Sequence, residues 1–312
     1  MSYTLKHGIL EIEVSDAFDG QPLTDYLKEL HLSGKKRYDL FQNHHILLNR
    51  SDADGREVLH KKDRLTFRLE SEAVDYTPAS RACEVVYEDD FVYVAHKEPG
   101  IIVHDAEDTD CLASQAAAWQ LENGVHSPVR YIHRLDRETT GLVLFVKVPL
   151  LQGWYDAMLE DKQIERRYLA ITGGKGHAGQ KFTYNQKIGR DRHEAGKYRF
   201  SSTGKEALTK AVVLDRKQDD LLLRCQLLTG RTHQIRVHLS GNRHPIVNDP
   251  LYGIPSSRYQ NMGLWADTLI FPNPFTKEIC IAKDLPNPDY ARFTYKAVSY
   301  THLRAHETLR YL

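Results

Sequence analysis

The sequence has little of what would assign a protein to a class at once. Its 312 residues include four cysteines, which lie far apart without a CxxC pair, so neither a zinc site nor a disulfide framework is indicated. No apolar run approaches the roughly 20 residues that cross a bilayer, and residues 1–10 lack the basic start and apolar centre of a secretory signal. We therefore expect a soluble, cytoplasmic protein without a membrane partner, built from one large domain and a small one.

The composition also lacks net charge, because 42 Lys and Arg balance 42 Asp and Glu. The charges are nevertheless segregated along the chain. Residues 76–160 carry 6 Lys and Arg against 14 Asp and Glu, whereas residues 161–297 carry 23 against 13. A basic half of this kind is typical of proteins that bind polyanions, although a linear count does not place the charges on one face.

Residues 1–75 are predicted to form a small separate module. Its pattern is two helices followed by two short strands, at residues 21–32, 35–43, 46–48 and 65–69. This order resembles a degenerate S4-type RNA-binding module, whose basic helix would carry Lys35, Lys36 and Arg37. Residues 43–45 (NHH) stand where such modules usually have a glycine turn, and a generic small appendage with a solvated basic face remains the alternative.

The large domain is placed at residues 76–297, after a polar linker at 70–81 that contains Pro78. Apolar or alternating runs predict strands, and alanine-rich or amphipathic runs predict helices. Strands are expected at residues 83–87, 91–95, 142–146, 166–172, 211–214, 221–227, 269–271 and 278–282, and helices at 111–121, at 149–162 and from a Thr229 or Thr232 cap to Gly241. The fold class is therefore α+β.

One acid stands at the mouth of a predicted buried strand. Asp136 lies between Arg134 and Arg137, and the apolar run 142–146 follows it. Strand ends are common places for reacting groups, because the sheet fixes the backbone while the turn leaves the side chain accessible. An ordinary turn residue or surface ion pair is the competing interpretation.

Two other segments carry candidate binding chemistry. Residues 186–210 are rich in Lys and Arg with interleaved Tyr and Phe, which suits a basic loop or hairpin that contacts unpaired RNA bases; a solvated hairpin is the alternative. His233 and His238 are five residues apart, so they would lie roughly 140° apart on a helix and could not share an ion. We predict no metal site.

Three blocks occur in a specific order: residues 133–136 (HRLD), 166–170 (RRYLA) and 228–239 (LTGRTHQIRVHL). Together they resemble the RluA family of rRNA and tRNA pseudouridine synthases, over roughly residues 80–295. Residues 188–191, 204–205 and 245–253 fit the same resemblance. It implies a pseudouridine-synthase domain, with a mixed, mainly antiparallel sheet flanked by helices and loops.

The resemblance also implies roles for single residues. Asp136 would be the essential acid, Arg231 its ionic partner, and Tyr168 the ring that stacks on a flipped uridine. Arg134 would enter the space that the base leaves. An apolar wall and further RNA contacts are expected from Ile235 and Leu239, and from His133, Arg190 and Lys205.

The reaction that this resemblance implies is an isomerisation, so we expect no cofactor. RNA is the expected partner, and the protein is expected to act as a monomer without an obligatory protein partner. The sequence departs from the family at Glu98, Asp105, Thr140, Asn248, Trp265 and Asn273, which bears on substrate preference rather than on the expected catalytic set.

Other interpretations remain. The chain could be a non-catalytic RNA-binding or ribosome-assembly protein on the same fold, which the presence of all three expected catalytic residues disfavours, or a metal-dependent hydrolase built on the histidines. Which uridine is modified, and whether in rRNA or tRNA, depends on RNA shape rather than on the catalytic set. Residues 298–312 continue no pattern and resemble the translation of a sequencing adapter, so we expect them to be disordered or packed arbitrarily.

Overall fold

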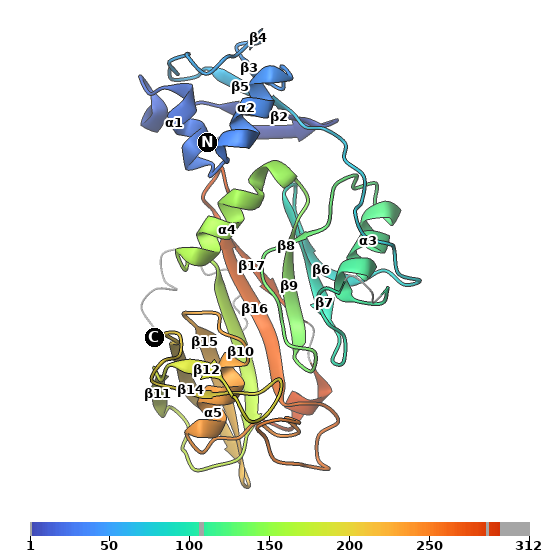
Figure 1. Cartoon of the computed structure of the whole chain (residues 1–312), viewed down its shortest axis with the longest axis vertical. Helices are drawn as coiled ribbons and strands as arrows, with labels where there is room; N and C mark the ends of the chain where they lie inside the picture. Colours follow the sequence, from blue (N-terminus) through green and yellow to red (C-terminus); the bar gives the residue numbers. More distant parts are fainter. Residues whose placement is uncertain (1, 106–108, 285–286, 294–312) are drawn as a thin grey trace.

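The structure is a computed structural model that describes residues 2–105, 109–284 and 287–293 (Figure 1). The C-terminal segment 298–312, for which we expect disorder, lies outside the described residues. Within the described part, no helix has both the length and the apolar character that a bilayer crossing requires.

The N-terminal module is a five-stranded sheet with strand order β1-β2-β5-β3-β4, packed with two helices. Its elements are β1 (Tyr3–Lys6), β2 (Ile9–Glu13), the 3₁₀ turn η1 (Asp16–Phe18), α1 (Leu23–Glu29), α2 (Gly34–Gln42), β3 (Ile46–Leu48), β4 (Ser51–Asp52) and β5 (Arg64–Arg68). The two predicted helices and two predicted strands are present, but β1, β2 and β4 were not predicted. The sequence pattern for the first hairpin is short, because only Leu10 and Ile12 alternate with glutamates. In the structure His7 and Gly8 both have positive φ, as a tight hairpin turn requires.

The large domain is built on a ten-stranded sheet whose main path is β11-β14-β15-β10-β16-β9-β7-β6. Its strands are β6 (Glu84–Glu88), β7 (Val92–Lys97), β8 (Arg130–Tyr131), β9 (Thr140–Val146), β10 (Glu165–Thr172), β11 (Lys181–Tyr184), β14 (Thr209–Lys217), β15 (Asp220–Leu227), β16 (Leu264–Pro272) and β17 (Ile279–Lys283). Strand β17 pairs with β16, and β8 with β9. Only the pairing of β9 with β16 is parallel among these strands, which confirms the mainly antiparallel α+β class.

Helices and a small hairpin flank this sheet. They are α3 (Leu112–Glu122), η2 (Pro149–Leu151), α4 (Gln152–Glu160), α5 (Gln234–Gly241), η3 (Pro288–Arg292) and the hairpin β12 (Ile188–Arg190) with β13 (Tyr198–Phe200). Helices α3 and α5 share one hydrophobic cluster with residues of the sheet such as Phe145 and Tyr168. Figure 1 shows α4 between the N-terminal module and the rest of the large domain.

Gly141 makes the central strand pairing possible. A Cβ atom at this position would lie 2.3 Å from the carbonyl oxygen of Ala266, and the φ angle of Gly141 is +120°. Only glycine accommodates both the backbone angle and the close approach of β16. The turn that carries Asp136 therefore ends at a fixed junction of β9 and β16.

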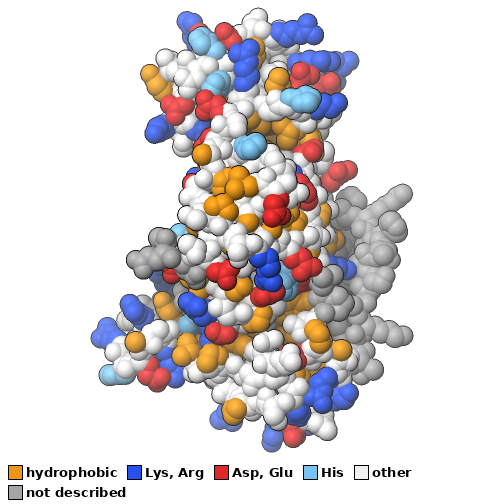
Figure 2. Space-filling view, turned by 90° about the vertical axis from the view of Figure 1, so that its right-hand side faces the viewer, with side chains coloured by type: hydrophobic (Ala, Val, Ile, Leu, Met, Phe, Trp, Pro, Cys, Tyr) orange, Lys and Arg blue, Asp and Glu red, His pale blue; other side chains and the backbone are white. Residues whose placement is uncertain are grey.

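The module packs directly against the large domain. The ring of Tyr3 lies 4.8 Å from that of Phe91 and 5.6 Å from that of Phe275, measured between centroids. Lys36 Nζ donates a hydrogen bond to the carbonyl of Pro149 at 2.7 Å, and burial lowers the pKa of this amine. Lys36 was expected to contact RNA, and this stays a prediction; in the structure its ammonium group already donates one hydrogen bond within the chain. The junction forms a narrow waist in Figure 2.

The segment interpreted as a linker, residues 70–81, follows the surface of the large domain with regular contacts. Asp75 accepts a hydrogen bond from the backbone N–H of Val129 at 2.8 Å and pairs with Arg130 at 2.6 Å. The hydroxyl of Tyr76 hydrogen-bonds with the ring of His104 in the loop after β7. The connecting segment is therefore bound to the large domain rather than a flexible linker.

Candidate active site

A cleft of about 750 Å³ opens where β10, α5 and the turn carrying Asp136 meet. Its lining residues come from four segments, within residues 102–104, 133–139, 156–168 and 227–236, and include Leu264. All three sequence blocks contribute to this lining. The fold thus brings together segments that are about a hundred residues apart in the chain.

Asp136 forms an ion pair in this cleft, but its partner is Arg236 rather than Arg231. Arg236 Nη1 donates to Asp136 Oδ2 at 3.1 Å, and the Asp136 side chain is 26% exposed. Arg231 is exposed, and its Nε donates to the carbonyl of Glu206 at 2.9 Å. The expected Arg231 pair is therefore wrong: α5 begins at Gln234, so Arg231 precedes the helix while Arg236 lies in its first turn and is buried.

A second carboxylate holds the same arginine. Arg236 Nε and Nη2 each donate to an oxygen of Asp249 at 2.8 Å, and the Asp249 side chain is fully buried. Burial disfavours the charged guanidinium, but the two carboxylates outweigh it and raise the pKa of Arg236. This fork fixes the guanidinium plane, and with it the donor that faces Asp136. The sequence offered Asp249 only as part of a matching segment, without a role.

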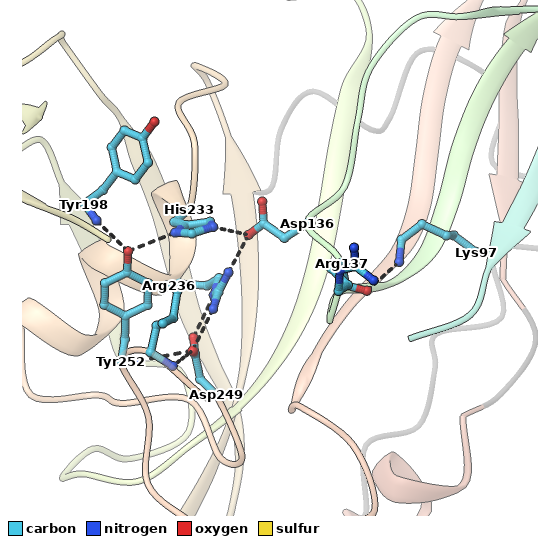
Figure 3. Close-up of polar contacts among 9 residues, drawn as sticks. Lys97, Asp136, Arg137, Tyr198, His233, Arg236, Asp249 and Tyr252 are labelled. Atoms are coloured by element: carbon cyan, nitrogen blue, oxygen red, sulfur yellow. Dashed lines mark hydrogen bonds and ion pairs between the residues drawn. The ribbon is translucent and has the colours of Figure 1, made fainter. Parts of the chain in front are cut away.

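His233 makes a longer contact with Asp136 (Figure 3). Its Nε2 lies 4.0 Å from Asp136 Oδ2, while its Nδ1 hydrogen-bonds with the Tyr252 hydroxyl at 2.9 Å. That hydroxyl also accepts from the backbone N–H of Tyr198. Because the carboxylate of Asp136 faces Nε2, we assign the imidazole proton to Nε2, and Nδ1 then accepts the proton of the Tyr252 hydroxyl. Burial lowers the pKa of His233, with Asp136 opposing this effect.

Tyr168 and His133 form part of the cleft floor. Tyr168 is 4% exposed, and burial raises its pKa to about 12, so its hydroxyl keeps its proton at neutral pH. His133 is 6% exposed, and neither ring nitrogen has a hydrogen-bond partner in the described structure. Burial, with a smaller effect from Arg166, lowers the pKa of His133 to about 3. Both ring nitrogens of His133 are covered by the protein although the residue lines the cleft, and its expected contact with RNA stays a prediction.

Lys97, which the sequence did not indicate, ties the turn of Asp136 to β7. Its side chain is completely buried, and its Nζ donates to the carbonyls of Glu98, Ile101 and Arg137 at 2.8 to 2.9 Å. Burial lowers the pKa of this amine to about 7, whereas the three carbonyls match the three N–H bonds of an ammonium group. Lys97 thus fixes the residue next to Asp136 (Figure 3).

The remaining predicted RNA contacts are distributed unevenly. Arg134 is exposed on the cleft lining and Ile235 lines the cleft, as their expected roles require. Leu239 is fully buried in the core and does not line the cleft, because it lies one helical turn beyond Ile235; its expected place in the wall is wrong. The other expected contacts are exposed or half-buried outside the cleft: Arg190 on the β12–β13 hairpin, Lys205 beside it, and Lys35 and Arg37 on α2.

Comparisons with known proteins identify the family of this chain. The RNA pseudouridylate synthase family matches residues 91–241, which contain all three blocks. The uncharacterized RNA pseudouridine synthase YhcT of Bacillus subtilis (strain 168) is 35% identical over 280 residues, or 88% of this chain and 92% of that protein. Ribosomal large subunit pseudouridine synthase D of Neisseria meningitidis serogroup A is 36% identical over 195 residues, or 62% of this chain and 52% of that protein.

A solved structure supports the same assignment. Human RNA pseudouridylate synthase domain containing 1 matches with a TM-score of 0.55 and 27% identity, covering 68% of this chain and 86% of that one. The family match contains the three sequence blocks, and the solved structure shares the fold. The chain therefore belongs to the RluA family of RNA pseudouridine synthases, enzymes that isomerise uridines in RNA.

Proposed function

We propose that this enzyme modifies a uridine in large-subunit ribosomal RNA, with Asp136 as the reacting carboxylate. The observation that carries the proposal for Asp136 is its ion pair with Arg236 in a cleft lined by all three sequence blocks. Support for ribosomal RNA is the similarity to Neisseria meningitidis pseudouridine synthase D, whose name assigns it to the large subunit. We further propose a monomer that acts in the cytoplasm without a cofactor.

The cleft supplies what the isomerisation needs. The base must leave C1′ of the ribose and return through C5, and an ionised acid starts this exchange. The positive charge of Arg236 at 3.1 Å stabilises the carboxylate of Asp136, and the low dielectric of a half-buried site strengthens this attraction. Asp136 remains partly exposed to the cleft, so it can reach the nucleotide.

Tyr168 and Arg134 are proposed to hold the flipped nucleotide. The ring of Tyr168 lies on the cleft floor, where it can stack on the base, and Ile235 adds an apolar surface beside it. Because the pKa of Tyr168 is about 12, its hydroxyl can donate a hydrogen bond in the resting enzyme, and it can take the C5 proton only after losing its own. Arg134 is exposed at the cleft and free to enter the RNA stack, which offsets a cost of a few kcal/mol for unstacking.

The test is tritium release from RNA that contains C5-labelled uridine. Unmodified transcripts of large-subunit rRNA and of tRNA are incubated with wild-type enzyme and with Asp136→Asn, which keeps the shape of the side chain but removes its charge. We expect release from the rRNA transcript with wild-type enzyme and none with the variant. Release from tRNA alone would refute the proposed target, and wild-type release by Asp136→Asn would refute the role of Asp136.

A further inference from the structure

Five Lys and Arg side chains line the cleft, and their positive charges are stabilised in different ways. Arg236 is held by two carboxylates, and Arg134, Lys162 and Arg231 are exposed to solvent. Arg166 is the exception, because it is half-buried and has neither a hydrogen bond nor an ion pair with any described residue. Its Nε is fully covered by protein and has no acceptor.

The position of Arg166 is built into the sheet. Arg166 and Tyr168 are two residues apart on β10, opposite Leu227 and Cys225 of β15, so both side chains face the cleft. The guanidinium lies over Gly230, where a Cβ atom would be 3.2 Å from Nη1. The absence of a side chain at Gly230 therefore leaves the space that the guanidinium occupies. Arg166 is also close enough to affect two neighbouring pKa values. It lowers the pKa of Tyr168, opposing the effect of burial, and lowers the pKa of His133, adding to the effect of burial.

The neighbouring Arg167 provides the contrast. It points to the opposite face of β10 and forms an ion pair with Glu165 at 2.6 Å. Arg167 is thus a cation on the same strand whose counter-charge is supplied by the protein. Nothing in the described structure supplies the equivalent for Arg166.

We infer that Arg166 binds a phosphate group of the RNA backbone next to the flipped uridine. This inference rests on the proposed function and deepens it by assigning a substrate contact. A partly buried cation without a counter-ion is costly unless a ligand supplies the charge, and a guanidinium fork matches a phosphate better than it matches a single uracil carbonyl. The acids nearest the reaction, Asp136 and Asp249, are already shared by Arg236, so neither is available to Arg166.

The experiment compares Arg166→Gln with Arg167→Gln, which removes the same charge from the other face. Filter binding of the unmodified rRNA transcript is measured from 50 to 400 mM KCl, together with single-turnover tritium release. For Arg166→Gln we expect binding to weaken by about 10- to 100-fold, as for loss of a charge-assisted hydrogen bond, and the salt slope to fall by about one phosphate contact. The release rate at saturating enzyme should remain within a few-fold, and Arg167→Gln should match the wild type in both assays.

Two further measurements separate phosphate binding from a structural role. Arg166→Lys keeps the charge and should keep the salt slope with intermediate affinity. A methylphosphonate at the phosphate beside the mapped uridine should weaken binding to wild-type enzyme but cause no additional loss with Arg166→Gln. The inference would be overturned if Arg166→Gln left the salt slope unchanged, or if the losses in affinity from Arg166→Gln and from the methylphosphonate were additive. Because binding is measured directly, absence of tritium release from this transcript would count against the proposed target and leave the result for Arg166 standing.

Discussion

Replacing Arg236 should damage this enzyme far more than replacing Arg231, although the two arginines belong to one sequence block. Arg236 donates three hydrogen bonds to two carboxylates, and its side chain is 4% exposed. In Arg236→Gln, Asp249 stays buried without its counter-charge. Loss of one partner of a buried ion pair costs about 3–5 kcal/mol, and we expect a decrease of this size in the free energy of unfolding.

The effect on catalysis should be larger for the same reason. Without Arg236, Asp136 loses both a charge at 3.1 Å and the donor that orients it. A misplacement of about 1 Å at a reacting group can lower the rate about 100-fold, so we expect at least this decrease in the single-turnover rate. Arg231→Gln removes an equal charge but only one hydrogen bond to a carbonyl at the surface, so its rate should stay within a few-fold and its stability within about 0.5 kcal/mol.

The assay must exclude differences in RNA binding. Tritium release is therefore measured in a single turnover with enzyme in saturating excess, and stability is measured by urea unfolding of each variant. Arg236→Lys serves as a control that keeps the charge but not the fork, and it should be intermediate in stability. If Arg231→Gln slows the reaction as strongly as Arg236→Gln, Arg236 is not the functional partner of Asp136.

Three other substitutions test how the site is held. Lys97→Met leaves three carbonyls without a donor and should destabilise the fold by about 3 kcal/mol. Because the pKa of Lys97 is about 7 in the fold and near 10.5 in the unfolded chain, the unfolded chain binds more protons between these pH values, so the difference in unfolding free energy between wild type and variant should widen as pH rises through this range. A constant difference in urea titrations would mean that the carbonyls keep the amine charged. Gly141→Ala places a methyl group 2.3 Å from the Ala266 carbonyl and should lower the thermal midpoint by about 3 °C, as expected for about 2 kcal/mol in a chain of this length, and an unchanged midpoint would contradict the close approach. Gly153→Ala places a Cβ 2.6 Å from the His31 carbonyl and should loosen the docking of the N-terminal module. Proteolytic cleavage at residues 70–81 should then be faster, while tritium release from a short RNA hairpin stays unchanged. Equal cleavage rates for variant and wild type would argue against rigid docking of the module.

Much of the fold could be predicted because hydrophobic periodicity decides it. The apolar run at β9 forms a completely buried strand, and the alanine-rich run at α3 forms a helix that is buried except for its last two residues; both elements lie within two residues of their expected bounds. The hairpin β1–β2 could not be predicted as easily, since its strands have four and five residues and only Leu10 and Ile12 are completely buried. The docking of the module was also missed, because contacts such as Tyr3 with Phe275 join residues that are far apart in sequence and have no local pattern.

The candidate site shows where sequence reasoning stops for a different reason. Arg231 and Arg236 are five residues apart in one block, so either could pair with Asp136 until the start of the helix is known. The structure settles this start through local chemistry: the Gln234 side chain accepts hydrogen bonds from Thr229 and from the backbone of Arg231, and His233 adopts a left-handed φ of 55°. This turn leaves Arg231 outside the helix and places Arg236 in its first turn, beneath Asp136. A shift of one residue in the helix start would rotate Arg236 by about 100° away from the acid, so the residues that fix the turn also determine which arginine pairs with Asp136.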